Sequence, residues 1–260
     1  MGENYALELR DISKRFGSVQ ANDHVNLTLR KSEILAILGE NGSGKTTLMN
    51  MIYGIYYPDE GHIFVNGNEV TIRSPKDSYE LGIGMVHQHF KLVDKYGFEL
   101  DLSQKIYEMS VSQKQTVEIV KMLYRGARIL ILDEPTAGLD PKERARFRNI
   151  ISALSKDRIV ILSTHIVSDI ESIANQVIMI KDKHLYQMDT VANICGLLEG
   201  KVYERPVADD DFTDFEKEHL VLSARQEQEF LQVRYYSEKP EAEAKPCTPN
   251  LEDMFLVSYQ

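Results

Sequence analysis

Hydrophobic runs of four or five residues recur along the chain, and three of them are followed directly by polar residues. These runs are Ile34–Leu38, Ile129–Leu132 and Ile159–Leu162. Short, continuous apolar runs are typical of strands that are buried on both faces, as in a parallel sheet. Ligands of open α/β sheets collect where such strands end. The pattern therefore predicts an α/β fold with a site at the carboxyl edge of its sheet.

The other periodic segments predict strands and helices around this sheet. Further strands are predicted at 7–10, 25–29, 63–65, 177–180 and 184–188. Helices are predicted after Gly44 and at 113–123, 141–154 and 168–174. Pro141 suits the first turn of its helix, and Asp140 is its predicted cap.

The pattern of apolar and polar residues changes after residue 200. This change predicts a main domain at 1–200 and a small α+β accessory domain at 201–260. A short helix ending near 218, a hairpin of 220–224 with 230–236, and a final helix at 251–257 are predicted there. The acidic run Asp209–Asp211 has two readings, a solvated helix cap or a metal site, and the cap is favoured.

A glycine-rich stretch follows the run 34–38 and satisfies G-x-x-x-x-G-K-[ST], the pattern of a phosphate-binding loop. Its glycines let backbone N–H groups point at one anion, and the next helix adds the positive end of its dipole. Lys45 supplies a positive charge, and Thr46 offers a hydroxyl to Mg²⁺. The alternative is a glycine-rich turn that matches the pattern by chance. The residues expected to bind nucleotide are Gly39, Asn41, Gly42, Ser43, Gly44, Lys45, Thr46 and Thr47.

Two adjacent carboxylates, Asp133 and Glu134, follow the run 129–132. Asp133 is suited to hold Mg²⁺, while Glu134 is suited to orient or deprotonate an attacking water. The alternative is an exposed acidic turn before Pro135. His165 follows the run 159–162, where a histidine is usually a capping or packing residue.

Six motifs in a fixed order give the chain a resemblance to the ATP-binding subunits of ABC transporters. They are Gly39–Thr47, Gln88, Ser110–Gln113, Asp133–Thr136, Gly138–Asp140 and His165. The resemblance covers residues 1 to about 200. It implies a P-loop NTPase fold of the ABC ATPase type with a small antiparallel β layer, ATP and Mg²⁺ as ligands, and ATP hydrolysis to ADP and phosphate.

The resemblance also implies a role for each matching residue. Phe16 would stack on adenine, although an ordinary half-exposed loop aromatic is the alternative. Asp140 would lie at the seam of an ATP-dependent homodimer. The residues implied in catalysis are Glu134, His165, Lys45, Gln88, Asp140 and Ser110, those implied in metal binding are Thr46, Gln88 and Asp133, and Ser110, Ser112 and Gln113 would contact nucleotide across the dimer.

Two subfamilies meet in this chain, and two departures from the family pattern put its activity in question. Residues 1–137 resemble sugar or nucleoside importer ATPases, whereas the remainder resembles multidrug or antibiotic exporter ATPases. Only 22 positions separate Gln88 from Ser110, so the helical subdomain of the family is reduced to a segment at 91–109. In the signature segment, Ser112 stands where the family has a glycine that lets the backbone approach the phosphate closely.

Composition narrows the choice of partners. The net charge of −10 argues against a general nucleic-acid binder, and no apolar run is long enough to span a bilayer. Two cysteines are too few for a disulfide scaffold and fit a reducing cytoplasm. We therefore expect a peripheral protein on the inner face of the cell membrane, bound to a transmembrane permease subunit.

The predicted function is that of the ATP-hydrolysing subunit of an ABC transporter, in which closure of the dimer on Mg-ATP drives transport. The tail of the chain favours export. The alternative is a soluble ATP-binding P-loop protein, natural or recombined, with little hydrolysis and no membrane coupling. The short segment between Gln88 and Ser110 is the feature that separates the two.

Overall fold

The computed structural model describes residues 5–86, 108–227, 230–239 and 244–259, and the chain divides into two compact units. Unit 1 is Met1–Met188 and unit 2 is Asp189–Gln260. This division falls before the boundary expected at residue 200, because helix α5 (Val191–Gly196) contacts helix α7 (Leu251–Ser258).

A six-stranded sheet with the order β10-β9-β3-β8-β7-β6 forms the centre of unit 1. Its strands are β3 (Ile34–Leu38), β6 (Ile83–Val86), β7 (Ile129–Asp133), β8 (Ile159–Thr164), β9 (Gln176–Lys181) and β10 (His184–Asp189). The pairs β6–β7, β7–β8, β8–β3 and β3–β9 are parallel. Every residue of β3 and of β8 is buried, which explains the unbroken apolar runs Ile34–Leu38 and Ile159–Leu162. The carboxyl ends of β3, β7 and β8 therefore meet at one edge.

A second sheet in unit 1 is the predicted antiparallel layer, with the order β2-β1-β4-β5. Its strands are β1 (Leu7–Phe16), β2 (Val19–Leu29), β4 (Glu60–Val65) and β5 (Asn68–Val70). The first two are longer than predicted, because irregularities in their pairing interrupt the alternation of apolar and polar residues. At these places Asp11 and His24 adopt positive φ angles of 53° and 47°.

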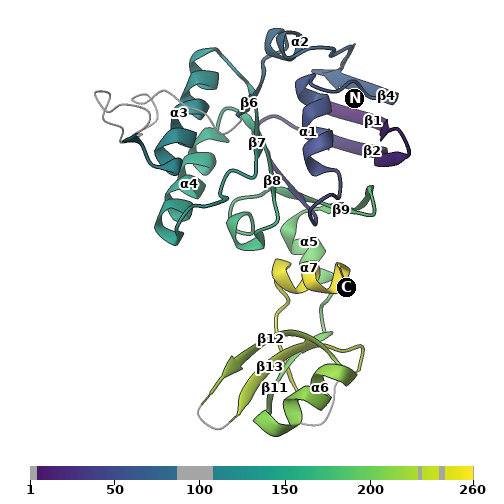
Figure 1. The fold of residues 1–260 in the computed structure, drawn as a ribbon, viewed down its shortest axis with the longest axis vertical. Helices are drawn as coiled ribbons and strands as arrows, with labels where there is room; N and C mark the ends of the chain where they lie inside the picture. The colour runs from purple at the N-terminus through teal and green to yellow at the C-terminus, as the bar shows by residue number, and fades with distance from the viewer. Residues whose placement is uncertain (1–4, 87–107, 228–229, 240–243, 260) are drawn as a thin grey trace. The chain divides into compact units, whose positions relative to one another are not determined.

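Four α-helices of unit 1 are described: α1 (Lys45–Tyr53), α2 (Pro75–Glu80), α3 (Val111–Tyr124) and α4 (Pro141–Leu154). Helix α1 contacts β2 of the antiparallel sheet and β6 and β7 of the parallel sheet (Figure 1). The buried side chains of both sheets and of α1 form one core. The helix predicted at 168–174 is wrong: this segment forms a 3-10 turn, η3 (Val167–Asp169), and further tight turns, with mostly i to i+3 hydrogen bonds.

Unit 2 contains a four-stranded antiparallel sheet with the order β12-β13-β11-β14. Its strands are β11 (Val202–Val207), β12 (Leu220–Gln226), β13 (Leu231–Tyr236) and β14 (Lys245–Pro246), and its helical segments are α5, η4 (Asp209–Asp211), α6 (Phe212–Glu218) and α7. A small core gathers on this sheet around the fully buried Val233 and Tyr235. Strand β11 was not predicted, because its polar residues and Pro206 hide it. Within the described residues, no group of three or more acidic, His or Cys side chains is arranged to hold a metal ion.

Candidate functional site

The loop between β3 and α1 has glycines where the backbone leaves no room for a side chain. Gly44 precedes α1 with a φ of 106°, and a Cβ on it would lie 2.3 Å from the carbonyl oxygen of Ala21. A Cβ on Gly39 would lie 2.7 Å from the carbonyl oxygen of Ile180. Gly42 has a φ of 80°, but a Cβ there would meet no described atom within 4 Å. The loop is therefore held closely at both ends and is open at its tip.

Lys45 is the first residue of α1, and its charge is almost completely buried. Its side chain is 6% exposed, and its Nζ donates hydrogen bonds to the carbonyl oxygens of Gly39 (2.7 Å) and Glu40 (3.1 Å). Nζ lies 3.9 Å from Oε1 of Glu134. Burial lowers the pKa of Lys45, while Glu134 and Asp133 act in the opposite direction. The ammonium group is thus placed under the loop with hydrogen bonds that a phosphate oxygen can replace.

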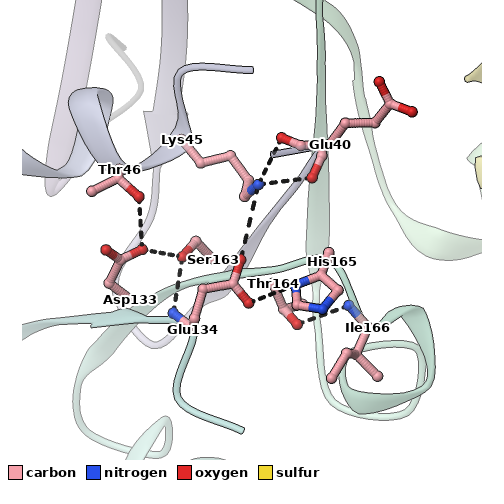
Figure 2. Close-up of polar contacts among 10 residues, drawn as sticks. Glu40, Lys45, Thr46, Asp133, Glu134, Ser163, Thr164, His165 and Ile166 are labelled. Atoms are coloured by element: carbon pink, nitrogen blue, oxygen red, sulfur yellow. Dashed lines mark hydrogen bonds and ion pairs between the residues drawn. The ribbon is translucent and has the colours of Figure 1, made fainter. Parts of the chain in front are cut away.

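The two carboxylates at the end of β7 lie across from this lysine, joined by Ser163 (Figure 2). Oγ of Ser163 donates to Oδ1 of Asp133 at 2.5 Å and accepts a hydrogen bond from the backbone N–H of Glu134 at 3.1 Å. The Thr46 hydroxyl donates to the same Oδ1 of Asp133 at 3.3 Å. One serine on β8 therefore fixes the side chain of Asp133 and the backbone of Glu134 together.

Glu134 has a φ of 44°, in the left-handed region where residues other than glycine are uncommon. Oε2 of its carboxylate lies 3.0 Å from Nδ1 of His165, and its Oε1 faces Lys45 (Figure 2). His165 is held close by because Thr164 is buried and its hydroxyl accepts from the N–H of Ile166. Strained backbone of this kind persists only where surrounding contacts impose it, and it gathers at functional sites.

Ser110 and Asp140 both stand at the start of a helix. Ser110 caps α3 in a reciprocal box with Gln113, and Asp140 caps α4 in a box with Glu143. Glu143 also accepts a hydrogen bond from Oγ of Ser110 at 3.4 Å, which joins the two helix starts. The predicted cap Asp140 is therefore present, and Ser110 contacts the Glu143 of its capping box.

The other predicted residues are placed less directly. Phe16 is 42% exposed at the end of β1, with its ring 5.0 Å from that of Tyr56 and Nζ of Lys14 5.5 Å from its ring centre. Thr47 is half-buried in α1, and Asn41 is exposed in the loop. Gln88, most of the segment 91–109 and the side chain of Ser112 lie outside the described residues.

The donor set fits a phosphate group and Mg²⁺. A carboxylate oxygen of Asp133 and the hydroxyl of Thr46 are hard oxygen ligands, the kind that Mg²⁺ takes alongside phosphate oxygens and water. The buried hydroxyl of Ser43 has no hydrogen-bond partner within the described residues. A ligand with acceptor oxygens would satisfy it.

Two contributors to this site were not predicted. Ser163 directly follows the apolar run 159–162 in the sequence, but only the fold shows its contacts with Asp133 and Glu134. Lys183 lies in the turn after β9, where its Nζ donates to the carbonyl oxygen of Gly42 and its own carbonyl accepts from the N–H of Asp23 at 3.1 Å. A lysine 141 residues from the loop carries no sequence signal that links the two.

Comparison with known protein families matches residues 22–137 to the family described as ABC transporter. This segment contains the glycine-rich loop, Lys45 and both carboxylates. The nucleotide-binding elements of unit 1 are thus similar to those of the ABC transporter family. This similarity agrees with the predicted ligands, ATP and Mg²⁺.

Named relatives support the same assignment. Identity is 40% over 216 residues to the nucleoside import ATP-binding protein NupA of Lactococcus lactis, covering 70% of this chain and 43% of that protein. It is 41% over 187 residues to the guanosine import ATP-binding protein NupO of Bacillus subtilis, covering 59% and 37%. The chain spans less than half the length of the curated relatives it matches.

Solved structures share the fold. A part of the ABC transporter complex cbiONQ from Clostridium perfringens matches with a TM-score of 0.63 and 25% identity, covering 72% of this chain and 89% of that one. A nucleotide-free ATP-binding cassette matches with a TM-score of 0.62 and 21% identity, covering 72% and 91%. The predicted P-loop fold of the ABC ATPase type is confirmed. In the described part of the chain, no helix is long and apolar enough to cross a membrane.

Proposed function

We propose that this chain binds and hydrolyses ATP as the energy-supplying subunit of an ABC transporter. One observation carries the proposal: the ammonium of Lys45 lies under the phosphate-binding loop, opposite the paired carboxylates Asp133 and Glu134. Thr46 and Asp133 would hold Mg²⁺, which neutralises charge on the outer phosphates when bound. The exposed ring of Phe16 would stack on the adenine ring.

In this proposal Glu134 holds the attacking water and accepts its proton. Its carboxylate is suited to that role because the hydrogen bond from its N–H to Ser163 fixes the backbone, and because His165 and Lys45 lie on either side of the two oxygens. Lys45 keeps one carboxylate oxygen oriented until phosphate takes its place. His165 would then contact the terminal phosphate from the carboxyl end of β8.

We further propose that two copies close on two ATP molecules, with Ser110 of one copy facing the loop of the other and Asp140 at the seam. The hydrogen bond that links Ser110 to Glu143 of the Asp140 capping box supports a common surface for these residues. A dimeric ATP-binding cassette bound to ADP and Pi is among the structures of similar fold (TM-score 0.58). The partner would be a transmembrane permease subunit, and the chain would lie at the inner face of the membrane.

For the direction of transport we propose import, which corrects the expectation of export. The relatives named above are a nucleoside and a guanosine import protein, and a ribose import protein of Caldanaerobacter is 33% identical. The export expectation rested on the second half of the chain, beyond the family match that ends at residue 137. The exporter-like character of that half stays a prediction.

A second candidate is an ATP-binding protein that does not couple to a membrane partner. The match to NupA runs over 216 residues but covers 70% of this chain, or about 182 residues. About 34 positions of the relative therefore have no counterpart here, and the short spacing from Gln88 to Ser110 is where the sequence predicts them to be missing. Loss of that subdomain would weaken coupling more than ATP binding.

Calorimetric titration with Mg-ATP tests the proposal. We expect the parent chain to bind and Lys45→Ala to lose at least tenfold in affinity, since the lysine is the buried positive charge of the loop. Lys76→Ala is the matched control, because its side chain is 81% exposed on α2, and it should bind like the parent. Equal affinities of all three would refute the assignment.

Chromatography of Glu134→Gln separates the two candidates. If the signature segment works, this variant should elute as a dimer with Mg-ATP and as a monomer without it. A variant that binds Mg-ATP in the calorimeter yet stays monomeric would refute the dimer and favour the second candidate.

A further inference from the structure

A cavity of about 860 Å³ opens at the amino edge of the parallel sheet, at the other end of the strands from the nucleotide site. Its apolar lining includes Leu81, Ile129 and Ile159, from the end of α2 and the first residues of β7 and β8. Its volume lies within the range of small-molecule sites. The proposed ATPase chemistry uses no residue of this cavity.

Four basic side chains line the cavity, and three of them have no partner within the part of the chain that the structure describes. Arg158 is occupied, because it pairs with Asp157 at 2.6 Å and donates to the carbonyl oxygen of Ala127. For Lys31, Arg125 and Arg128, the described part of the chain provides no ion pair or side-chain hydrogen bond. Three uncommitted cations around one cavity are notable in a chain whose net charge is −10.

Several acceptors of the same cavity already have donors. Its two carboxylates are engaged, Asp157 with Arg158 and Glu80 with Lys76 at 3.9 Å. Basic residues near helix ends commonly serve the last carbonyl groups. Here those carbonyls have other donors. The backbone N–H groups of Ile129 and Ile159 donate to the carbonyl oxygens of Gly82 and Arg128. The Tyr79 hydroxyl donates to that of Arg125, and Nε of Arg158 donates to that of Ala127.

We propose that this cavity is a binding site for a small organic phosphate. The uncommitted groups of the cavity include hydrogen-bond donors, and two of them are guanidinium groups whose planar fork matches a phosphate group. Apolar side chains and the half-exposed ring of Tyr79 complete the lining and suit the organic part of the ligand. The site is separate from the phosphate-binding loop, so the inference does not depend on the proposed ATPase function.

Pyridoxal phosphate is a suitable probe, because it combines an aromatic ring with a phosphate and carries an aldehyde. The aldehyde condenses with a lysine amine to an imine with loss of water, and borohydride reduction then fixes the label for mass spectrometry. We expect Lys31 to be labelled at least tenfold faster than Lys76, which is also exposed but lies outside the cavity. Excess AMP should suppress the label at Lys31 and leave Lys76 unchanged.

The double variant Arg125→Gln and Arg128→Gln should lower labelling of Lys31 at least tenfold, because each guanidinium supplies a charge-assisted contact. Lys45→Ala should leave it unchanged, which separates this site from the nucleotide loop. If the double variant fails to fold by circular dichroism, the AMP competition on the parent chain still decides. Labelling of Lys31 at the rate of Lys76, or competition by an acidic peptide and not by AMP, would overturn the proposal.

Discussion

Replacement of Ser163 by alanine tests how the two carboxylates of the nucleotide site are held. Ser163 is fully buried, and its hydroxyl makes one hydrogen bond to the Asp133 carboxylate and another to the N–H of Glu134. Removing it leaves a buried N–H and a carboxylate oxygen without this partner. Glu134, with its φ of 44°, also loses a contact that holds a strained backbone.

The magnitude follows from the two hydrogen bonds. A hydrogen bond to a charged group contributes about 1.5–3 kcal/mol and a neutral one about 0.5–1.5 kcal/mol. We therefore expect Ser163→Ala to lower the free energy of unfolding by about 2–4 kcal/mol. Because the carboxylate of Glu134 would be positioned less well, kcat for ATP hydrolysis should fall at least tenfold, with a smaller change in KM.

Urea unfolding followed by circular dichroism measures the first effect, since the chain has no tryptophan. Ser155→Ala is the matched control: the Ser155 hydroxyl donates to the carbonyl oxygen of Ser152 at 2.9 Å at the exposed end of α4. The control should change stability by less than about 0.5 kcal/mol. If Ser163→Ala is as mild as the control, the serine does not hold the carboxylates.

Two further predictions concern the loop. Gly44→Ala should lower the free energy of unfolding by at least about 2 kcal/mol and abolish Mg-ATP binding, because it adds steric overlap to an unfavourable φ; Gly42→Ala should cost about 1 kcal/mol, and equal melting temperatures for the two variants would contradict this account. Burial lowers the pKa of Lys45 in the folded state. Below that pKa the buried lysine is charged and destabilises the fold. As the pH rises from that pKa towards the ordinary value, the folded state loses the proton first and the free energy of unfolding increases. Lys45→Met should remove this gain, seen as a smaller rise of the urea midpoint from about pH 7 to pH 10 than in the parent; identical pH profiles would contradict the shift.

Much of the fold could be predicted because its central strands are buried on both faces. Unbroken apolar runs such as Ile34–Leu38 and Ile159–Leu162 leave few alternatives to a parallel sheet. The full lengths of β1 and β2 could not be predicted, because bulges at Asp11 and His24 change which residues face the core. Strand β11 could not be predicted, because the polar residues around Pro206 give no strand pattern. Its pairing with β13 and β14 stabilises it.

Within the site, residues close in sequence were predictable and those joined by the fold were not. Local sequence patterns predict the geometry of the loop before Lys45 and of the capping residues Ser110 and Asp140. The contact of Ser163 with Asp133 depends on the pairing of β7 with β8, which places them opposite each other. No local pattern encodes such a neighbour.

The turn at Asp182 and Lys183 has a mechanical consequence. Lys183 touches the loop at Gly42, and strand β10 runs from this turn to Asp189, the first residue of unit 2. A strand is already near full extension, at about 3.3 Å per residue, so it stretches little under tension. Force applied to unit 2 along the chain therefore enters unit 1 at β10, the edge strand that is hydrogen-bonded to β9 and begins at the turn beside the loop. The chain itself thus links the second unit to an element next to the nucleotide site.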